Sequence, residues 1–413
     1  MDIPISETRT RWAEEQVEQL LSIPFISEFV FRSPQNLEGP RNTQREVADL
    51  LIDHLGKGLL VSQKAQEDPE SRNDRRNELW VLKNATGAVD QLIGALRSPT
   101  TPFWCDHPRR GRVDYANGLP TIVHGVVVAE TFRPVDLHSA ASNLPLEYAG
   151  IPITYLSLND FLNLAMQLRT VPELYAYLTA RRALPESVLR RFGQEQVLLE
   201  YFLLQGSFTS CRGHEHAAEV LERRAEERNE VLNRMVDYRE GSAYLEYVIN
   251  ALATRSATCL EGLSPRWAAS FDPTESRSNY LRMQAVLSDL SLRERAELGE
   301  NFEYVIGTLA DQAEGYVHNA VRLDSKPEWV FLFASSKGVA REEIFRRIET
   351  SMRGAMAFYD KQRCMVVVDR DGEGYEVAVT RPDLVYVPTA AEVQYGEQAF
   401  GRLRTASVVV DRY

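Results

Sequence analysis

The stretch EVADLLIDHLGKGLLVSQKAQ, residues 46–66, decides the predicted fold of the N-terminal part of this chain. It contains two apolar runs, at 47–53 and 58–65, which flank a Gly-Lys-Gly sequence at 56–58. Apolar runs of this length predict strands, and glycine supplies the positive φ that tight hairpin turns require. We therefore expect a β-hairpin here.

The polar residues of this hairpin carry its chemical interest. Asp49 lies inside the first predicted strand. Ser62 and Lys64 are two residues apart in the second, so both are expected on the same face of that strand. An aspartate and a lysine are therefore expected to project from neighbouring strands. Such a pair suits phosphodiester hydrolysis, because the carboxylate holds a divalent cation while the ammonium orients water or stabilises phosphate charge. The alternative is a structural ion pair in an ordinary hairpin.

The flanking sequence supplies the rest of a small α/β core. Apolar residues at helical spacing predict a helix over about 8–22, and the run 25–31 predicts a strand. Downstream, 79–97 predicts a helix despite two glycines, and 121–130 predicts a buried strand. The predicted order is helix, strand, strand, strand, helix, strand.

This αβββαβ order, with Asp49 on the second strand and Lys64 on the third, resembles the core of the PD-(D/E)XK nuclease superfamily over about residues 8–130. The resemblance implies that Asp49 binds a metal ion, Mg²⁺ or Mn²⁺, and that Lys64 assists the attacking water. It also implies a metal-binding glutamate on the first helix, for which Glu14 or Glu15 is available. A glutamine on the following helix recurs in several branches, and Gln91 matches it.

One position departs from the pattern of that superfamily. The third-strand acid is expected two residues before the lysine, where this chain has Ser62. A serine removes a full negative charge and an oxygen ligand from a small site for a hard metal ion. Either another acid replaces it or the site has lost its activity. The candidates are Glu46, Glu67, Asp68 and Asp90.

Composition sets the broad class of the chain. Its 413 residues are enough for two or three cores, and 44% apolar with 26% charged residues is typical of a globular protein. No run of 18 apolar residues occurs and the N-terminus is no signal peptide, so we expect a cytoplasmic protein without membrane partners. The four cysteines stand singly, which predicts reduced thiols rather than disulfides or a zinc site.

A net charge of −12 argues against binding nucleic acid through bulk electrostatics, but leaves room for a local basic groove. Six arginines in two loops of the predicted domain are candidates for contacts to a phosphate backbone. The alternative is that both loops are simply solvated. These residues are Arg72, Arg75 and Arg76 after the hairpin, and Arg109, Arg110 and Arg112 before the fourth strand.

Beyond the hairpin domain we predict two further regions. A strand at 151–156 and a helix to 168 extend the first domain, giving 1–170 as nuclease-like. Residues 171–325 are predicted to be mainly helical. Residues 326–413 predict a small α/β unit in the order strand, helix, strand, strand.

Three other patterns are weaker as sites. Cys211–His216 places histidines two apart, which splits them between helix faces and disfavours a metal site. His124 lies in an apolar strand and is expected to be a core residue. Ser335–Gly338 joins a strand to a helix but lacks the glycine spacing of a phosphate-binding loop, so a plain connection is expected.

The sequence thus predicts a metal-dependent nuclease that acts on nucleic acid, with DNA favoured. The chain also resembles large bacterial proteins in which such a nuclease precedes helical and α/β segments, and the analogy implies defence against foreign DNA. The alternative is a catalytically silent nuclease-like scaffold that binds nucleic acid or a protein partner. A protein partner or a homo-oligomer is compatible with either hypothesis.

Overall fold

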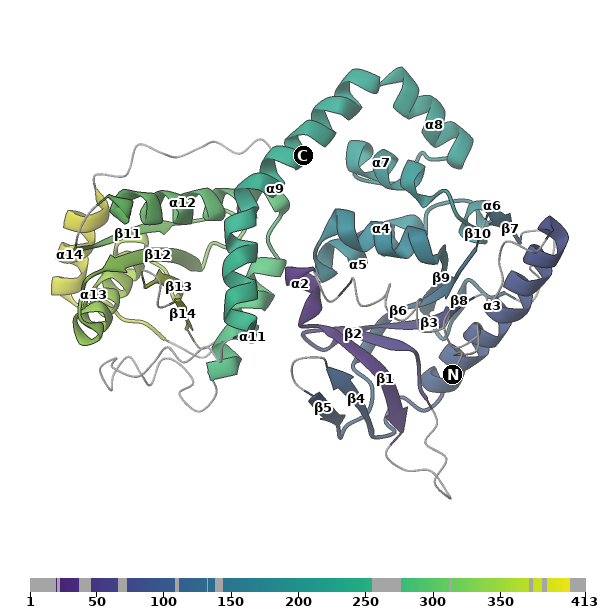
Figure 1. The fold of residues 1–413 in the computed structure, drawn as a ribbon, viewed down its shortest axis with the longest axis horizontal. Coiled ribbons are helices and arrows are strands. Elements are labelled where there is room, and N and C mark those ends of the chain that lie inside the picture. Colours follow the sequence, from purple (N-terminus) through teal and green to yellow (C-terminus); the bar gives the residue numbers. More distant parts are fainter. Residues whose placement is uncertain are drawn as a thin grey trace, which may run out of the picture. The chain divides into compact units, whose positions relative to one another are not determined.

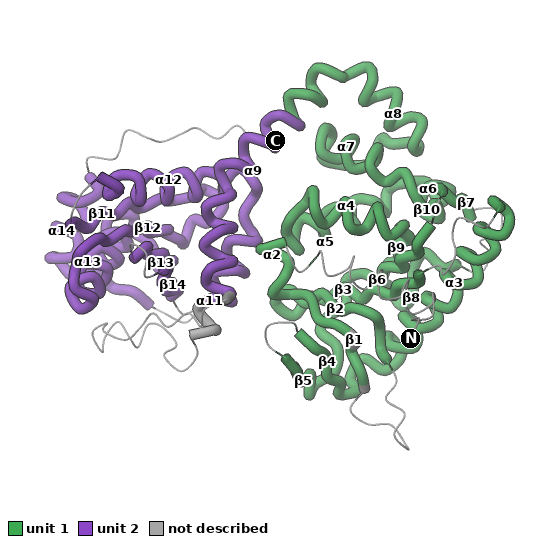
Figure 2. The backbone as a smooth tube through the Cα atoms, in the orientation of Figure 1, with its two compact units in different colours: residues 1–231 green, residues 232–413 purple. Residues whose placement is uncertain are grey.

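The chain, seen in a computed structural model, divides into two compact units, Met1–Val231 and Leu232–Tyr413 (Figure 2). Both are mixtures of helices and strands, which confirms the predicted mixed α/β class. Among the described residues, no helix is long and apolar enough to span a membrane. The structure describes residues 20, 23–36, 46–65, 73–107, 111–131, 133–137, 144–254, 276–311, 314–370, 374–380 and 385–401.

Unit 1 is built on an eight-stranded mixed sheet in the order β5-β4-β1-β2-β3-β6-β9-β8 (Figure 1). The first three strands in sequence form an antiparallel meander, and β6 and β9 then run parallel to β3. The strands are β1 (Val30–Asn36), β2 (Leu50–His54), β3 (Lys57–Lys64), β4 (Phe103–His107), β5 (Gly111–Tyr115), β6 (Thr121–Ala129), β8 (Glu147–Tyr148) and β9 (Ile151–Ser157).

The hairpin is present, but its turn lies one residue earlier than predicted. Leu55 and Gly56 form the turn, with φ of 54° and 81°, which is the two-residue hairpin turn that follows the twist of the strands. Lys57 and Gly58 already belong to β3, where Gly58 pairs with Asp53. Asp49 lies just before β2, not inside it.

Two other predicted elements differ from the structure. The run predicted as a strand at 25–31 begins with a short helix, α2 (Pro24–Ser27), because proline suits the first turn of a helix; β1 starts only at Val30. The loop expected before the fourth strand contains a hairpin, β4 and β5, which pairs with β1. Most of the helix predicted at 8–22 lies outside the described residues.

Helix α3 (Asp74–Leu96) covers one face of the sheet. It starts five residues before the predicted helix, because the side chain of Asn73 caps it by accepting a hydrogen bond from the Arg76 amide at 3.0 Å. Its buried stripe packs on alternate residues of β2 and β3, among them Leu51 and Leu60. The buried side chains between α3 and the sheet form one hydrophobic core.

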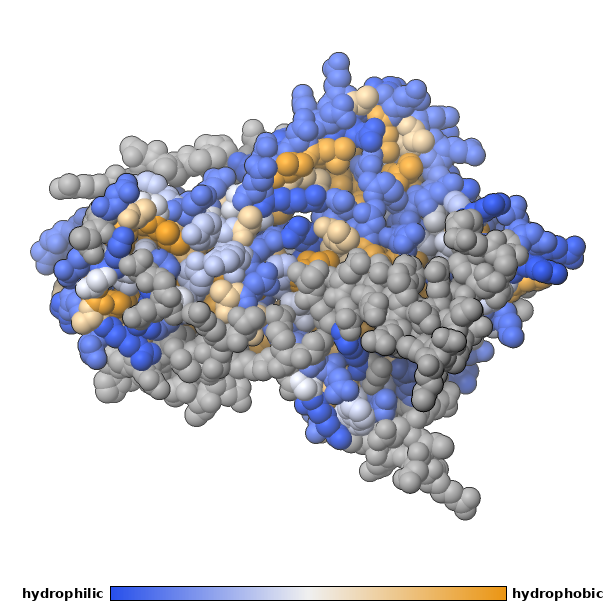
Figure 3. Space-filling view, in the orientation of Figure 1, coloured by the Kyte–Doolittle hydropathy of each residue, from blue (hydrophilic) through white to orange (hydrophobic). Residues whose placement is uncertain are grey.

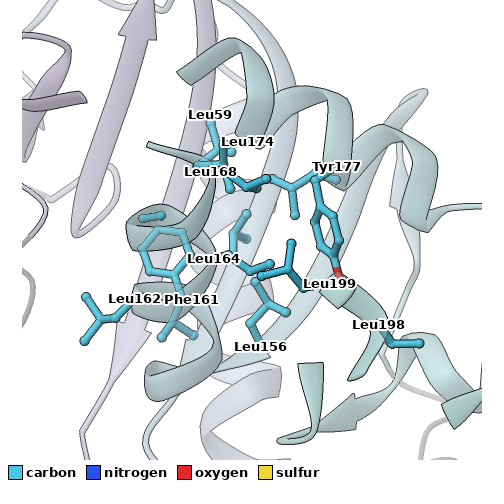
Figure 4. Close-up of a cluster of buried hydrophobic side chains, with 14 of the residues drawn as sticks. Leu59, Leu156, Phe161, Leu162, Leu164, Leu168, Leu174, Tyr177, Leu198 and Leu199 are labelled. Atoms are coloured by element: carbon cyan, nitrogen blue, oxygen red, sulfur yellow. The ribbon is translucent and has the colours of Figure 1, made fainter. Parts of the chain in front are cut away.

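Helices α4 (Leu158–Leu168), α5 (Val171–Arg181), α7 (Glu195–Gln205) and α8 (His214–Arg223) contribute to the core on the opposite face (Figure 4). The predicted boundary near 170 cuts through this core, because Phe161 and Leu174 on either side of it belong to the same cluster. Hydrophobic residues also reach the surface around α7 and α8 (Figure 3), where Val197, Phe202 and Leu203 are only partly buried. Short elements complete the unit: β7 (Val135–Asp136), α6 (Glu186–Leu189) and β10 (Arg191–Phe192).

Unit 2 contains a four-stranded sheet in the order β11-β12-β13-β14, with β12 and β13 parallel. The sheet includes β11, which precedes residue 326, so it crosses the predicted boundary between a helical region and an α/β region. The α13 crossover joins the two parallel strands. The elements are α9 (Ala225–Thr254, shared with unit 1), α11 (Ser276–Ser288), α12 (Leu292–Ala310), β11 (Gly315–Val321), β12 (Trp329–Lys337), α13 (Arg341–Tyr359), β13 (Arg363–Asp369), β14 (Tyr375–Val379) and α14 (Ala390–Phe400).

Candidate functional site

The site lies at the carboxyl end of β3, on the face that α3 covers. Because side chains alternate along a strand, Ser62 and Lys64 share the face of Leu60, which packs in the α3 core. Asp49 lies in the segment just before β2, and its amide donates to the carbonyl of Val61 on β3 at 3.1 Å. The hairpin therefore brings an acid and a base to one edge of the sheet.

The Asp49 carboxylate has two partners on β3. Its Oδ2 accepts a hydrogen bond from the Gln63 amide at 2.6 Å and lies 3.7 Å from Lys64 Nζ. The side chains of Asp49 and Lys64 retain 27% and 28% of their exposure. The pair is thus held in place by the backbone and remains accessible to solvent, as a site for an incoming ligand requires.

Gln91 of α3 joins the other two side chains. Its Oε1 accepts one hydrogen bond from Ser62 Oγ at 2.8 Å and another from Lys64 Nζ at 3.2 Å. Lys64 therefore lies between the carboxylate of Asp49 and the amide oxygen of Gln91. The structure brings together all four residues that were predicted to meet here from the hairpin and the following helix.

Ser62 explains how the fold accommodates the missing acid. The residue is fully buried, and its hydroxyl donates to Gln91, so the polar group is satisfied without any ion. Among the described residues, no group of three or more His, Cys, Asp or Glu is placed to hold a metal ion. Among the described residues of this cluster, the oxygen atoms that could contact a metal ion are those of the Ser62 hydroxyl, the Asp49 carboxylate and the Gln91 side-chain amide.

This donor set fits one kind of metal binding. Mg²⁺ usually keeps several waters and is held by one or two carboxylates together with the phosphates of its substrate. Asp49, whose carboxylate is partly exposed, can supply that protein share, while Gln91 Oε1 is already occupied by the hydrogen bonds from Ser62 and Lys64. A cation would then bind together with a phosphate rather than in a cage made by the protein alone.

The remaining candidate acids do not complete this cluster. Asp90 is exposed on α3, and Glu46 is exposed beside Gln35, with which it forms an isolated β-bridge. Within the described part of the chain, neither joins Asp49 in a metal-binding group of three or more His, Cys, Asp or Glu residues. Glu14, Glu15, Glu67 and Asp68 lie outside the described residues.

The arginines predicted to contact phosphate are only partly described. Arg75 and Arg76 are exposed in the first turn of α3, the helix that carries Gln91. Arg112 lies on β5, where it bonds Asp114 at 2.8 Å and stacks on Trp104 at 4.8 Å, so it is part of a hairpin rather than of a loop. Arg72, Arg109 and Arg110 lie outside the described residues.

A buried polar cluster on the other face of the sheet was not predicted. Arg181 donates to both carboxylate oxygens of Glu195, at 2.6 and 3.1 Å, and the Tyr177 hydroxyl donates to the same carboxylate at 2.6 Å. The Glu195 amide donates to Asp160 at 3.1 Å, and burial raises the pKa of Asp160. Its members come from three helices, α4, α5 and α7, so no local sequence pattern indicated the cluster.

The weaker sequence patterns have ordinary structural roles. His124 is buried, and burial together with Arg182 and Arg181 lowers its pKa to about 4. His216 accepts from the Arg212 amide at 3.3 Å, and among the described residues no metal-binding group includes it. Ser335, Ser336 and Lys337, expected in a connection, are instead the last residues of β12, and Lys337 Nζ donates to the carbonyl of Ala310 at 3.0 Å.

No family model, curated protein or solved structure matches this chain.

Proposed function

We propose that unit 1 is a metal-dependent nuclease that hydrolyses phosphodiester bonds. One observation carries the proposal: Asp49 Oδ2 and Lys64 Nζ lie 3.7 Å apart at the end of paired strands, and Gln91 Oε1 contacts the same ammonium at 3.2 Å. The strand order supports it, since a meander of β1, β2 and β3 is followed by α3 and by β6 parallel to β3. Apart from the β4–β5 hairpin inserted after α3, and from the first helix, most of which lies outside the described residues, this is the order that the resemblance to PD-(D/E)XK nucleases implies.

Each residue has a distinct part in this proposal. The Lys64 ammonium orients the attacking water and stabilises the charge that develops on the phosphate. Gln91 positions Lys64, and the Gln63 amide positions the carboxylate of Asp49. Asp49 would hold Mg²⁺ or Mn²⁺, which supplies charge neutralisation at the phosphate when it is bound.

DNA is the substrate that we favour, with a role in defence against foreign DNA by analogy alone. The exposed Arg75 and Arg76 extend from the start of the helix that carries Gln91 and can contact a phosphate backbone. Their contribution should appear in the salt dependence of binding to duplex DNA. The slope of log affinity against log salt should flatten by roughly 0.9 for each phosphate that a variant no longer neutralises.

One observation favours a second function, a silent scaffold that binds nucleic acid without cutting it. Ser62 is fully buried and already bonded to Gln91, and only one carboxylate of the described residues lies at the centre. An ion pair between Asp49 and Lys64 stabilises this arrangement without a metal ion.

Cleavage assays on single- and double-stranded DNA and RNA, with Mg²⁺ or Mn²⁺, separate the two. The test variant is Asp49→Asn, which retains an oxygen for the Gln63 amide but removes the charge. We expect its turnover to fall by at least about 10²-fold, as removal of one strong electrostatic group does elsewhere. Asp90→Asn, which changes an exposed acid of α3 beside Gln91, serves as the matched control and should cut normally.

The outcomes are distinct. Cleavage by the wild type that Asp49→Asn abolishes supports the nuclease. Binding of nucleic acid by the wild type, without cleavage under any of these conditions, supports the scaffold. Equal cleavage by the wild type and Asp49→Asn contradicts the assignment of the site.

A further inference from the structure

The candidate site contains one acid and one base among its four side chains, Asp49, Ser62, Lys64 and Gln91. Asp49 Oδ2 and Lys64 Nζ are 3.7 Å apart, so charge attraction rather than a hydrogen bond holds the pair together. At this separation, and with side chains that are 27% and 28% exposed, the pair contributes little to folding. It is therefore a contact that ligands can replace at small cost.

Each member of this pair keeps bonding capacity that the described residues do not use. The Asp49 carboxylate accepts the Gln63 amide on Oδ2, while its Oδ1 accepts no hydrogen bond from the described part of the chain. An ammonium has three N–H donors. Among the described residues, that of Lys64 makes one hydrogen bond, to Gln91 Oε1 at 3.2 Å. A carboxylate oxygen and the other ammonium donors are thus left for ligands at the same point.

The two charges oppose each other's ligands. A divalent cation on Asp49 is repelled by the adjacent ammonium, and a phosphate on Lys64 is repelled by the adjacent carboxylate. When both ligands bind together, two contacts between opposite charges replace the ion pair, and the cation also attracts the phosphate. Even in bulk water, the interaction of two unit charges about 4 Å apart corresponds to about a 5-fold change in affinity, and it is stronger where water is partly excluded.

We propose that the ion pair of Asp49 and Lys64 couples the two ligands, so that the site binds a divalent cation and a nucleic-acid phosphate together and holds either one alone only weakly. This inference rests on the proposed nuclease, which assigns the cation to Asp49 and the phosphate to Lys64. The hydrogen bonds from the Gln63 amide and to Gln91 keep the two side chains in position during the exchange. Because coupling between two ligands is reciprocal, each raises the affinity for the other by the same factor.

Binding of the cation alone tests the ion pair without any need for cleavage. Titration of the full chain with Mn²⁺, followed by the electron paramagnetic resonance of the free ion, measures this affinity. Lys64→Met removes the ammonium and keeps a side chain of similar length, so it should tighten Mn²⁺ binding by at least about 5-fold. Lys83→Met is the matched control, because it removes the same charge from an exposed position of α3 about two turns before Gln91. It should leave the affinity for Mn²⁺ unchanged.

The reverse test uses DNA without a cation. Fluorescence anisotropy with a labelled duplex and with its single strand, in buffer with a chelator, measures the affinity for a phosphate backbone. Asp49→Asn removes the charge beside Lys64, so it should tighten DNA binding by at least about 5-fold. Asp90→Asn removes the same charge from an exposed position of α3 and should change this affinity little. Added Mn²⁺ should raise the DNA affinity of the wild type much more than that of Asp49→Asn, which lacks the charged ligand for the cation.

The results separate this inference from the proposed function. Tighter Mn²⁺ binding by Lys64→Met together with tighter DNA binding by Asp49→Asn supports the coupling, whether or not the wild type cleaves DNA. If either variant binds its ligand no more tightly than the wild type does, the coupling is overturned, even where the wild type cleaves DNA and the nuclease stands. Both side chains are partly exposed, so the variants should fold, and Lys64→Gln repeats the Mn²⁺ titration if Lys64→Met does not.

Discussion

Unit 1 contains two acid–base pairs that differ in almost every physical respect. Arg181 and Glu195 meet through two hydrogen bonds of 2.6 and 3.1 Å, and their side chains are 1% and 2% exposed. Asp49 and Lys64 stand 3.7 Å apart at more than a quarter of their full exposure. One pair is closed to solvent, and the other is open to it.

The difference separates a structural role from a functional one. A bidentate pair in the interior is costly to break, since the remaining charge has no solvent to replace its partner. It joins α5 to α7, so it fixes how these helices pack. A loose and half-open pair contributes little to folding, but its charges remain available to a ligand. Four changes would break or sharpen this contrast.

The largest effect is expected from Glu195→Gln. The change leaves the Arg181 guanidinium buried without its counter-charge, so we expect the free energy of unfolding to fall by about 3–5 kcal/mol. Urea denaturation measures the loss. The double variant Arg181→Met with Glu195→Leu should recover part of it, because neither charge of the pair then stays buried, while the Tyr177 hydroxyl loses its acceptor. A loss below about 1 kcal/mol in the single variant would place this pair in the same class as Asp49 and Lys64.

The next largest effect is a loss of folding stability at low pH, which we expect from His124. Burial and the nearby Arg182 and Arg181 lower the pKa of this histidine to about 4. A histidine whose folded pKa is lowered stabilises the protein above its unfolded pKa of 6.5. That stability is lost as the pH falls toward 4. At about 1.36 kcal/mol for each pKa difference of one, the loss reaches about 3 kcal/mol below pH 4.

The measurement is the free energy of unfolding between about pH 7 and pH 4 for the wild type and for His124→Gln, which does not titrate. The curve of the variant should be flatter over this range. Asp160 acts in the opposite sense, because its raised pKa favours the folded state as the pH falls, but it is present in both proteins. Parallel curves would show that His124 does not titrate in this way.

A smaller effect is expected from Ser62→Glu, which restores the acid at a fully buried position. Without metal, the new carboxylate faces Gln91 in place of a hydroxyl, and we expect a loss of stability of about 1–3 kcal/mol. Mn²⁺, and to a lesser extent Mg²⁺, should offset that loss, because Mn²⁺ tolerates imperfect geometry better. Thermal denaturation with each ion measures the offset, and buffer with a chelator provides the baseline. An identical loss with and without either ion would argue for the scaffold.

The smallest effect on folding is expected from Asp49→Asn. The side chain is partly exposed and the amide oxygen still accepts from Gln63, so the free energy of unfolding should change by less than about 1 kcal/mol. The same urea experiment as for Glu195→Gln measures it. A change as large as that of Glu195→Gln would assign Asp49 a structural role and remove the contrast.

The approach of Asp49 to Lys64 could be predicted from the sequence, because it depends on local rules. A hairpin aligns two strands, and the alternation of side chains then fixes which residues share a face. For the same reason α4 ends at the predicted residue 168, and β12, α13, β13 and β14 follow in the predicted order strand, helix, strand, strand, since the apolar period of each element is encoded within a short stretch. Strand β11, which lies in the region predicted to be helical, is the exception.

Tertiary packing decided the rest. Gln91 lies 29 residues after Ser62 and 27 residues after Lys64 in the chain. It reaches both only because α3 packs on the sheet. The pair Arg181 and Glu195 and the pairing of β11 across the predicted boundary at 325 likewise unite residues from separate elements. Local sequence patterns specify the period and the ends of an element, but not which of its neighbours it meets. That choice follows from burying the apolar faces together, and the polar partners follow from it.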